Sequence, residues 1–307
     1  ILIDCSFMNN TATDGCGMFN WESSPSLANC AFDNNEAFAQ GGGMYNYSSS
    51  SNPTLTDCTF TNNTASLYGG GMHNDTESSP TLIRCTFTNN TAHQGGGMDN
   101  SWYSNPSLTD CIFTNNTADQ GGGMYNWGYS NPTLTDCTLT SNTSDYGNGV
   151  LNFRASTNFF GTNTSDELLI SSISSLAFSA ESTCDVTGST VLSSEGTISF
   201  DIDAINTSSS LNMSESIDLL GGLVVTNNST SLLAANVGDI IPLAQASTLV
   251  GNFDSIVFPL MPEGLGLQLT DYPALRGGGS EVAAEVIEVE GAEFANPFTG
   301  DLDSPPV

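Results

Sequence analysis

The sequence contains no lysine, and only three arginines (Arg84, Arg154 and Arg276) face 33 acidic side chains, for a formal net charge of −30. Nucleic-acid binding needs a basic surface to neutralise phosphates, so this composition argues against it, and anionic membrane surfaces are disfavoured on the same grounds. No run of about 18 apolar residues exists, so we expect no membrane insertion. A basic start followed by an apolar run is also missing, and no signal peptide is visible.

Charged residues are nevertheless scarce, at 12% of the 307 residues, and hydrophobic residues make up 38%. That apolar fraction is sufficient for a folded core and argues against wholesale disorder. The length predicts about two domains.

A repeated unit dominates the first half of the chain: Cys-x-Phe-x-x-Asn-x-Ala, then Gly-Gly-Gly-Met-x-Asn, then Asn-Pro-Thr-Leu-Thr-Asp before the next cysteine. Such self-similarity indicates a repeat architecture. The cysteines are Cys5, Cys30, Cys58, Cys85, Cys111 and Cys137. A first asparagine column comprises Asn10, Asn35, Asn63, Asn90, Asn116 and Asn142, and a second comprises Asn20, Asn46, Asn74, Asn100, Asn126 and Asn152. Phenylalanines, methionines and leucines recur in the same register.

This pattern predicts a β-solenoid with one coil per repeat. Cys and Phe alternate with Thr as in a strand with one buried face, and Gly, Asn and Pro divide the unit into about three short strands. A unit of this size cannot bury a face alone, so the units must stack, with a rise of about 4.8 Å per coil. We therefore expect internal columns of Cys, Phe, Met and Leu. Both Asn columns are expected at turns, with amides bonded from coil to coil.

These repeats resemble the right-handed parallel β-helix of pectate-lyase-like proteins. They are similar to the FxxN and GGA[IL] repeats of chlamydial polymorphic outer-membrane proteins and to repeats of large bacterial surface proteins. The resemblance covers residues 1–154 and implies a right-handed parallel β-helix of about six coils. It specifies the fold far better than the function, because the same coil carries lyases, adhesins and scaffolds.

After Arg154 the repeat stops. Short apolar runs in residues 155–290 predict a second all-β domain, either sandwich-like or an irregular solenoid, and residues 291–307 are interpreted as a tail or linker. One apolar run, Val282–Val289, is a candidate strand for donation to a neighbouring copy. Because the chain begins in mid-coil, we expect either further coils upstream or head-to-tail stacking of copies into a homopolymer.

Catalysis is not expected, although a polysaccharide lyase or hydrolase is the alternative. A lyase of this fold needs a basic residue to take a proton, and a hydrolase uses clustered aspartates. Asp4, Asp57, Asp110 and Asp136 form one column, for which a solvated outward row is favoured over a catalytic cluster. Arg84 occupies the same slot and is interpreted as repeat drift. Calcium between stacked aspartates is an alternative, although the dense ligand spacing of a dedicated loop is missing.

The two histidines, His73 and His93, occupy different repeat slots, and no Cys-x-x-Cys spacing supports a metal site. We therefore predict no metal and no cofactor. Free thiols are favoured over disulfides in the cysteine column, because parallel neighbours in register form a strained bridge. Cys16 and Cys184 lie outside the column and are weaker candidates for a bond between subunits.

Glycans are the favoured modification. An outward row of Asn-x-Thr sequons precedes the first asparagine column, and others lie further on, so the candidate acceptors are Asn9, Asn62, Asn89, Asn115, Asn163, Asn206, Asn212 and Asn227. Trp21, Tyr47, Trp127 and Phe153 form an outward aromatic column suited to sugar stacking or partner packing. The sequence thus predicts an extracellular or cell-surface structural protein of a surface layer or fibre, glycosylated and without catalysis. The alternative is an adhesin or a polysaccharide-binding or polysaccharide-degrading β-helix protein.

Overall fold

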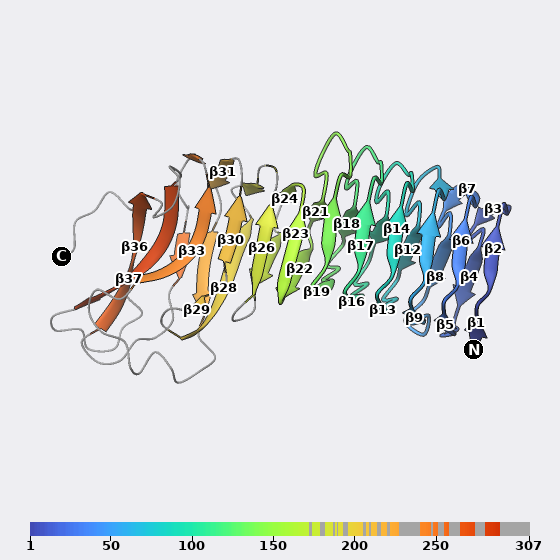
Figure 1. Cartoon of the computed structure of the whole chain (residues 1–307), viewed down its shortest axis with the longest axis horizontal. Helices are drawn as coiled ribbons and strands as arrows, with labels where there is room; N and C mark the ends of the chain where they lie inside the picture. The colour runs from blue at the N-terminus through green and yellow to red at the C-terminus, as the bar shows by residue number, and fades with distance from the viewer. Residues whose placement is uncertain are drawn as a thin grey trace.

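The computed structural model shows a stack of coils along one long axis (Figure 1). It describes residues 1–171 without a gap. Beyond them it describes residues 174–178, 182–186, 188, 190–192, 196–204, 207–208, 210–213, 216–219, 222–226, 240–246, 248–250, 255–257, 265–273 and 280–288. The predicted tail, residues 291–307, lies outside this part of the chain. No helix among the described residues has the length and apolar content needed to cross a membrane.

Each coil contributes one strand to each of three parallel sheets. The first sheet contains β1 (Leu2–Ile3), β5 (Ser26–Ala28), β9 (Thr54–Thr56), β13 (Thr81–Ile83), β16 (Ser107–Thr109), β19 (Thr133–Thr135), β22 (Ser156–Phe160), β25 (Ser175–Phe178), β28 (Thr197–Ala204), β32 (Gly222–Thr226) and β35 (Ser255–Val257), with β29 (Thr207–Ser208) antiparallel to β28. The second contains β2 (Ser6–Met8), β6 (Ala31–Asp33), β10 (Thr59–Thr61), β14 (Thr86–Thr88), β17 (Ile112–Thr114), β20 (Thr138–Thr140), β23 (Thr162–Ser165), β26 (Thr183–Val186), β30 (Ser210–Met213) and β33 (Ile240–Ala246).

The third sheet contains β4 (Met18–Trp21), β8 (Met44–Tyr47), β12 (Met72–Asp75), β15 (Met98–Asn100), β18 (Met124–Trp127), β21 (Val150–Phe153), β24 (Leu168–Ser171), β27 (Thr190–Leu192), β31 (Ser216–Leu219) and β34 (Thr248–Val250). A short fourth sheet contains β3 (Thr11–Asp14), β7 (Glu36–Gln40) and β11 (Thr64–Ala65). Repeat positions pair in register throughout the first six coils, as in Phe60↔Phe87 and Met72↔Met98. The predicted parallel β-helix is thereby confirmed.

The predicted apolar columns lie inside the coils. Cys30 to Cys137, the leucines and the methionines from Met44 onward are buried, and only the first-coil members Leu2, Cys5, Phe7 and Met18 are partly exposed. The phenylalanine rings stack almost parallel, with centroids 4.6 Å apart for Phe60 and Phe87 and 4.5 Å for Phe87 and Phe113. This spacing follows from the rise of the coils, which brings equivalent side chains one above another.

The first asparagine column forms a continuous hydrogen-bonded ladder. Asn90 donates from Nδ2 to the Phe60 carbonyl oxygen (2.9 Å) and to Oδ1 of Asn116 (3.0 Å). Its own Oδ1 accepts from the backbone N–H and the side-chain amide of Asn63, each at 3.0 Å. Each buried amide is therefore fully used, as a stable polar ladder requires.

The turn prediction holds for the first asparagine column and is wrong for the second. Each asparagine of the first column follows the left-handed residue of a turn, for example Asn89 with φ 56°. The second asparagine column lies within the third-sheet strands, where Asn74 donates to Asn100 and Asn100 to Asn126, each at 2.8 Å. At the first turn a single left-handed residue bends the chain, so the next side chain, that of the ladder asparagine, points back into the interior.

The glycine triplets are required by backbone conformation and by packing. The first glycine of a triplet is left-handed, as in Gly95 with φ +63°. A Cβ on the third, Gly97, would stand 2.6 Å from the carbonyl oxygen of Gly123 and 2.7 Å from the Phe113 ring. Successive coils thus approach too closely for any side chain.

All eight cysteines are free thiols. A hydrogen bond with the Cys111 thiol, together with burial, raises the pKa of Cys85 to about 12. A hydrogen bond with Cys137, together with burial, raises the pKa of Cys111 to about 12. Cys85 and Cys111 are thus protonated at neutral pH and lack the thiolate form that reacts with oxidants and alkylating agents, whereas the hydrogen bond with Cys111 lowers the pKa of Cys137.

We expect this column to make stability fall at alkaline pH. A thiol in the unfolded chain ionises near pH 8.5, whereas the folded Cys85 and Cys111 thiols hold their protons to about pH 12. Their contribution is fully present below the unfolded pKa and is lost as the pH rises, at up to about 1.4 kcal/mol per unit for each thiol. Urea unfolding between about pH 8 and pH 11 measures this loss, and Cys111→Ala should reduce its slope. Equal slopes in the variant and the parent would contradict the prediction.

The parallel ladders continue beyond residue 154, with β22 pairing β19 and β25. Thr138 pairs Thr164, and Asn163 pairs Cys184. Asn163 and Cys184 therefore extend the cysteine column, which corrects the view of Cys184 as unmatched. The Asn ladder ends at Asp166, whose Oδ2 accepts from the backbone N–H of Asn142 at 2.7 Å.

Further along, β37 (Ser280–Glu288) pairs antiparallel with β33 and β36 (Leu265–Pro273) of its own chain. Both edges of β37 are thus paired within its own chain, so its donation to a neighbouring copy would require it to leave these strands and stays a prediction. The division of residues 155–307 into a second domain and a tail stays a prediction.

Candidate functional site: the outer face of the third sheet

The sequon row lies where the sequence placed it, with one exception. Asn9, Asn62, Asn89 and Asn115 are exposed and left-handed. Asn163 is buried, contrary to the prediction: its Oδ1 accepts from the Cys137 backbone N–H (2.9 Å) and its Nδ2 donates to the Phe160 carbonyl oxygen (2.8 Å). It occupies the inward cysteine slot, so a glycan cannot reach it. The side chains of Asn206, Asn212 and Asn227 lie outside the described residues.

The aspartate column is a row of exposed turn residues. Asp4, Asp57, Asp110 and Asp136 each precede an inward cysteine and have φ of 53° or 54°. Arg84 occupies the same slot and binds Asp57 through Nε and Nη2, at 2.7 and 3.0 Å from the two carboxylate oxygens. This pairing lowers the pKa of Asp57. Aspartate tolerates the left-handed conformation, which accounts for its recurrence here.

The two histidines have different surroundings. His93 is exposed, and its Nδ1 lies 2.7 Å from Oδ2 of Asp119 on the surface loop. His73 is buried in β12, and its Nδ1 lies 2.9 Å from Oδ1 of the buried Asp99 in β15. Within the described residues, no three His, Cys, Asp or Glu side chains gather as a metal site.

His73 and Asp99 belong to a column on the outer face of the third sheet that is buried except for its first member, Phe19. Its members alternate with the inward methionines, and they are Phe19, Tyr45, His73, Asp99, Tyr125 and Leu151. The loop before each glycine triplet covers this face: Tyr68 lies with its ring centroid 5.5 Å from that of His73. The Tyr45 ring stacks on the other side at 4.9 Å. Burial, reinforced by nearby carboxylates, raises the pKa of both Tyr45 and Tyr125.

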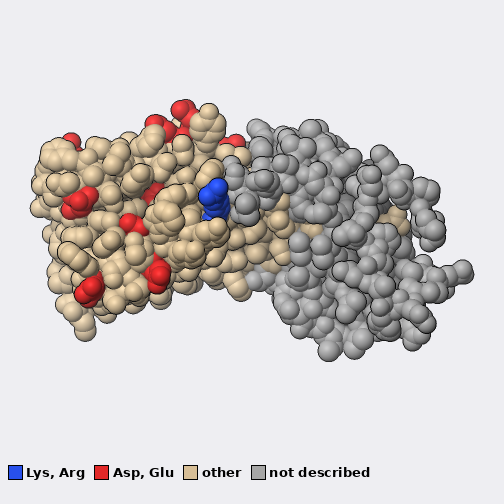
Figure 2. Space-filling view, turned by 180° about the vertical axis from the view of Figure 1, so that it is seen from behind, with Lys and Arg blue, Asp and Glu red and all other residues tan. Residues whose placement is uncertain are grey.

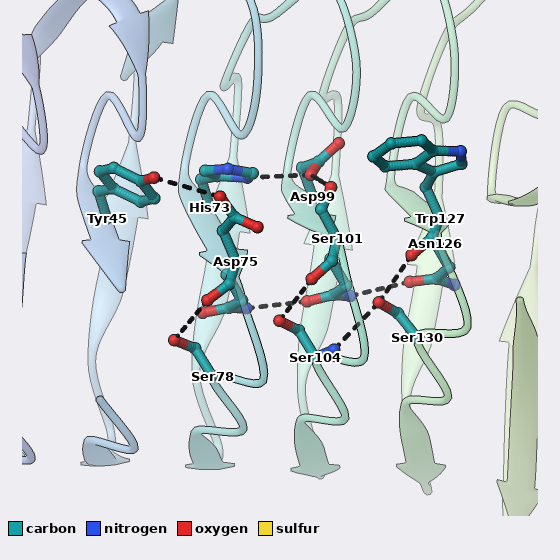
Figure 3. A network of polar contacts seen from close by, with 12 residues as sticks. Tyr45, His73, Asp75, Ser78, Asp99, Ser101, Ser104, Asn126, Trp127 and Ser130 are labelled. Carbon is teal, nitrogen blue, oxygen red and sulfur yellow. Dashed lines mark hydrogen bonds and ion pairs between the residues drawn. The ribbon is translucent and has the colours of Figure 1, made fainter. Parts of the chain in front are cut away.

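Hydrogen bonds link this column to the turn after the sheet (Figure 3). Ser101 donates from Oγ to Oδ1 of Asp99 at 2.7 Å, and the Tyr45 hydroxyl lies 3.4 Å from Oδ2 of Asp75. Ser104 donates to the Ser101 carbonyl oxygen at 2.7 Å, and its backbone N–H donates to Ser130 Oγ at 3.1 Å. The chain leaving each strand is thereby held in a fixed shape.

That fixed turn presents an exposed aromatic cluster, here called the aromatic turn: Trp102, Tyr103, Trp127 and Tyr129. The indole centroids of Trp102 and Trp127 are 4.3 Å apart at an interplanar angle of 70°, and the Tyr103 and Tyr129 rings stack at 5.3 Å. Trp102, Tyr103 and Tyr129 are 46%, 52% and 51% exposed. All three are left-handed, with φ of 48°, 63° and 68°.

The sequence located only part of this site. The outward column of Trp21, Tyr47, Trp127 and Phe153 is confirmed, each side chain being exposed or half-buried. Trp102, Tyr103 and Tyr129 were not predicted, because they lie in the loop whose length varies between repeats. His73 and Asp99 were missed as a pair because a strand pattern marks outward residues as solvated and says nothing of a covering loop.

Comparison with known proteins supports the architecture. Residues 1–98 match the family model described as right handed beta helix region. No curated protein matches the chain. With the parallel ladders described above, the match identifies the coils as a right-handed parallel β-helix.

Proposed function

We propose that the protein is an extracellular structural rod without catalytic activity. The observation that supports this proposal is the set of internal ladders that run through the repeat coils. The hydrogen-bonded asparagines, stacked phenylalanines and close-packed glycines continue from coil to coil. These ladders join neighbouring coils to one another, and the turns and loops form the surface, as in other quasi-one-dimensional repeat proteins. Glycans on the exposed row at Asn62, Asn89 and Asn115 would cover one edge of the rod.

The surface charge supports a role in a wet, crowded layer. On the described part of the face shown in Figure 2, acidic side chains are dispersed and basic ones occupy one small area. A net charge of −30 keeps such rods soluble and attracts cations. Head-to-tail assembly of copies stays a prediction, which light scattering against protein concentration tests.

Immunogold electron microscopy of the cells that make the protein tests its location. We expect label on the cell surface or in extracellular material, together with glycopeptides containing Asn62, Asn89 or Asn115 in mass spectra of the native protein. Label confined to the cell interior would contradict the proposal. Multiple turnover of a polysaccharide by the purified protein would contradict the non-catalytic role.

A further inference from the structure

We propose that the aromatic turn is a binding site for an uncharged saccharide. The first argument is backbone strain. Bulky side chains are rarely left-handed, and each such residue costs roughly 1–2 kcal/mol. The same two turn positions hold Thr76 and Glu77 one coil earlier, so the turn itself does not require aromatic rings. Strain retained by exposed aromatic residues points to a role for their side chains.

The second argument is that the rings are held in place before any ligand arrives. The backbone N–H of Tyr103 donates to the Gly128 carbonyl oxygen at 3.0 Å. Asn105 and Asn131 each donate from Nδ2 to the carbonyl oxygen of the tyrosine two residues before, also at 3.0 Å. A Cβ on Gly128 would stand 3.2 Å from the Trp102 backbone nitrogen, so glycine there lets Trp102 lie against the next coil. A fixed platform loses little entropy on binding.

The third argument is the charge around the rings, which selects the ligand. The exposed Glu77 lies on one side, and its backbone N–H donates to the Trp102 carbonyl oxygen at 2.8 Å. Arg154 lies on the other, with its carbonyl oxygen accepting from the Tyr129 N–H. With an acidic residue, Glu77, on one side of the turn and a basic residue, Arg154, on the other, the surroundings favour neither a cation nor an anion, and the net charge of −30 further disfavours a polyanion. A sugar ring fits both limits, because it stacks through its C–H face and its hydroxyls donate as well as accept.

The tryptophans make a direct test. Trp21, Trp102 and Trp127 are the only three in the chain, and two of them lie in the aromatic turn. We expect titration with cellohexaose, chitohexaose or mannohexaose to change the tryptophan fluorescence saturably for at least one of them. Polygalacturonate and a soluble quaternary ammonium salt serve as charged probes.

Isothermal titration calorimetry with variants places the site. Trp102→Asn keeps a residue that tolerates the left-handed backbone, and we expect it to weaken binding at least tenfold, as should Trp127→Ala. Trp21→Ala, an exposed tryptophan outside the aromatic turn, should bind like the parent, and circular dichroism verifies folding of all three. The proposal is overturned if no neutral oligosaccharide binds, if only a charged probe binds, or if folded Trp102→Asn binds like the parent. Failure of this proposal would leave the proposed structural role intact, because a rod that binds no sugar can still be a structural rod.

Discussion

Replacing Asn90 by alanine should destabilise the coils by about 4 kcal/mol or more. The variant removes four buried hydrogen bonds: those from the Asn63 N–H and side-chain amide, and those to the Phe60 carbonyl oxygen and Oδ1 of Asn116. The Asn63 amide keeps its bond to the Phe32 carbonyl oxygen, and Oδ1 of Asn116 keeps the Asn90 N–H. Each lost hydrogen bond contributes about 1 kcal/mol, and a buried donor left unpaired, such as the Asn63 N–H, costs about 1–3 kcal/mol. Because Asn63, Asn90 and Asn116 are fully buried, we expect solvent not to replace the lost hydrogen bonds.

The measurement is urea unfolding followed by circular dichroism, with thermal melting as a second probe. The matched control is Asn89→Ser, one residue earlier and exposed, because Ser141 already occupies that turn position in the sixth coil with φ 60°. We expect the control to remain within about 1 kcal/mol of the parent, as surface substitutions usually do. Equal losses in the two variants would show that the ladder adds nothing beyond the turn.

The same ladder shows why the first half of the chain was predictable. The side-chain period of a strand is two, so a cysteine and a phenylalanine two residues apart must share a face. Repetition at 25 to 28 residues then fixes the register between coils, because any shift by one residue would turn Phe87 outward. Interior position, register and ladder membership therefore follow from spacing alone, and the structure confirms them.

The remaining features depend on information that spacing does not contain. Asn163 stands 26 residues after Cys137, the usual step, but it lacks the phenylalanine and asparagine that mark a repeat, so the sequence presented it only as a sequon. The spacing from Cys137 was the signal that could have placed Asn163 in the inward cysteine slot. The end of the Asn ladder at Asp166 gave no signal, because a carboxylate replaces the amide and the coil length changes there.

The covered outer face could not be found from strand periodicity. Tyr45, His73 and Asp99 occupy outward positions, and only the folding of the loop over them makes them interior. The aromatic turn could not be predicted for a different reason: its residues lie in a loop and show no repeating period. Its position follows from the structure of the turn, in which Trp102 lies in register with Gly128 of the next coil.

Replacing Phe87 by alanine should cost about 3–5 kcal/mol, the usual loss when a buried phenylalanine is truncated. Phe87 is fully buried between Phe60 and Phe113, so its removal breaks two ring stacks and opens a cavity within the rod. Phe87→Leu should cost less than about 1.5 kcal/mol, because Leu139 already fills the same slot in the sixth coil, paired with Phe113. Urea midpoints of the two variants, measured beside the parent, decide the matter. If alanine were tolerated as well as leucine, the stacked rings would add no stability beyond that supplied by the asparagine ladders and the other apolar columns.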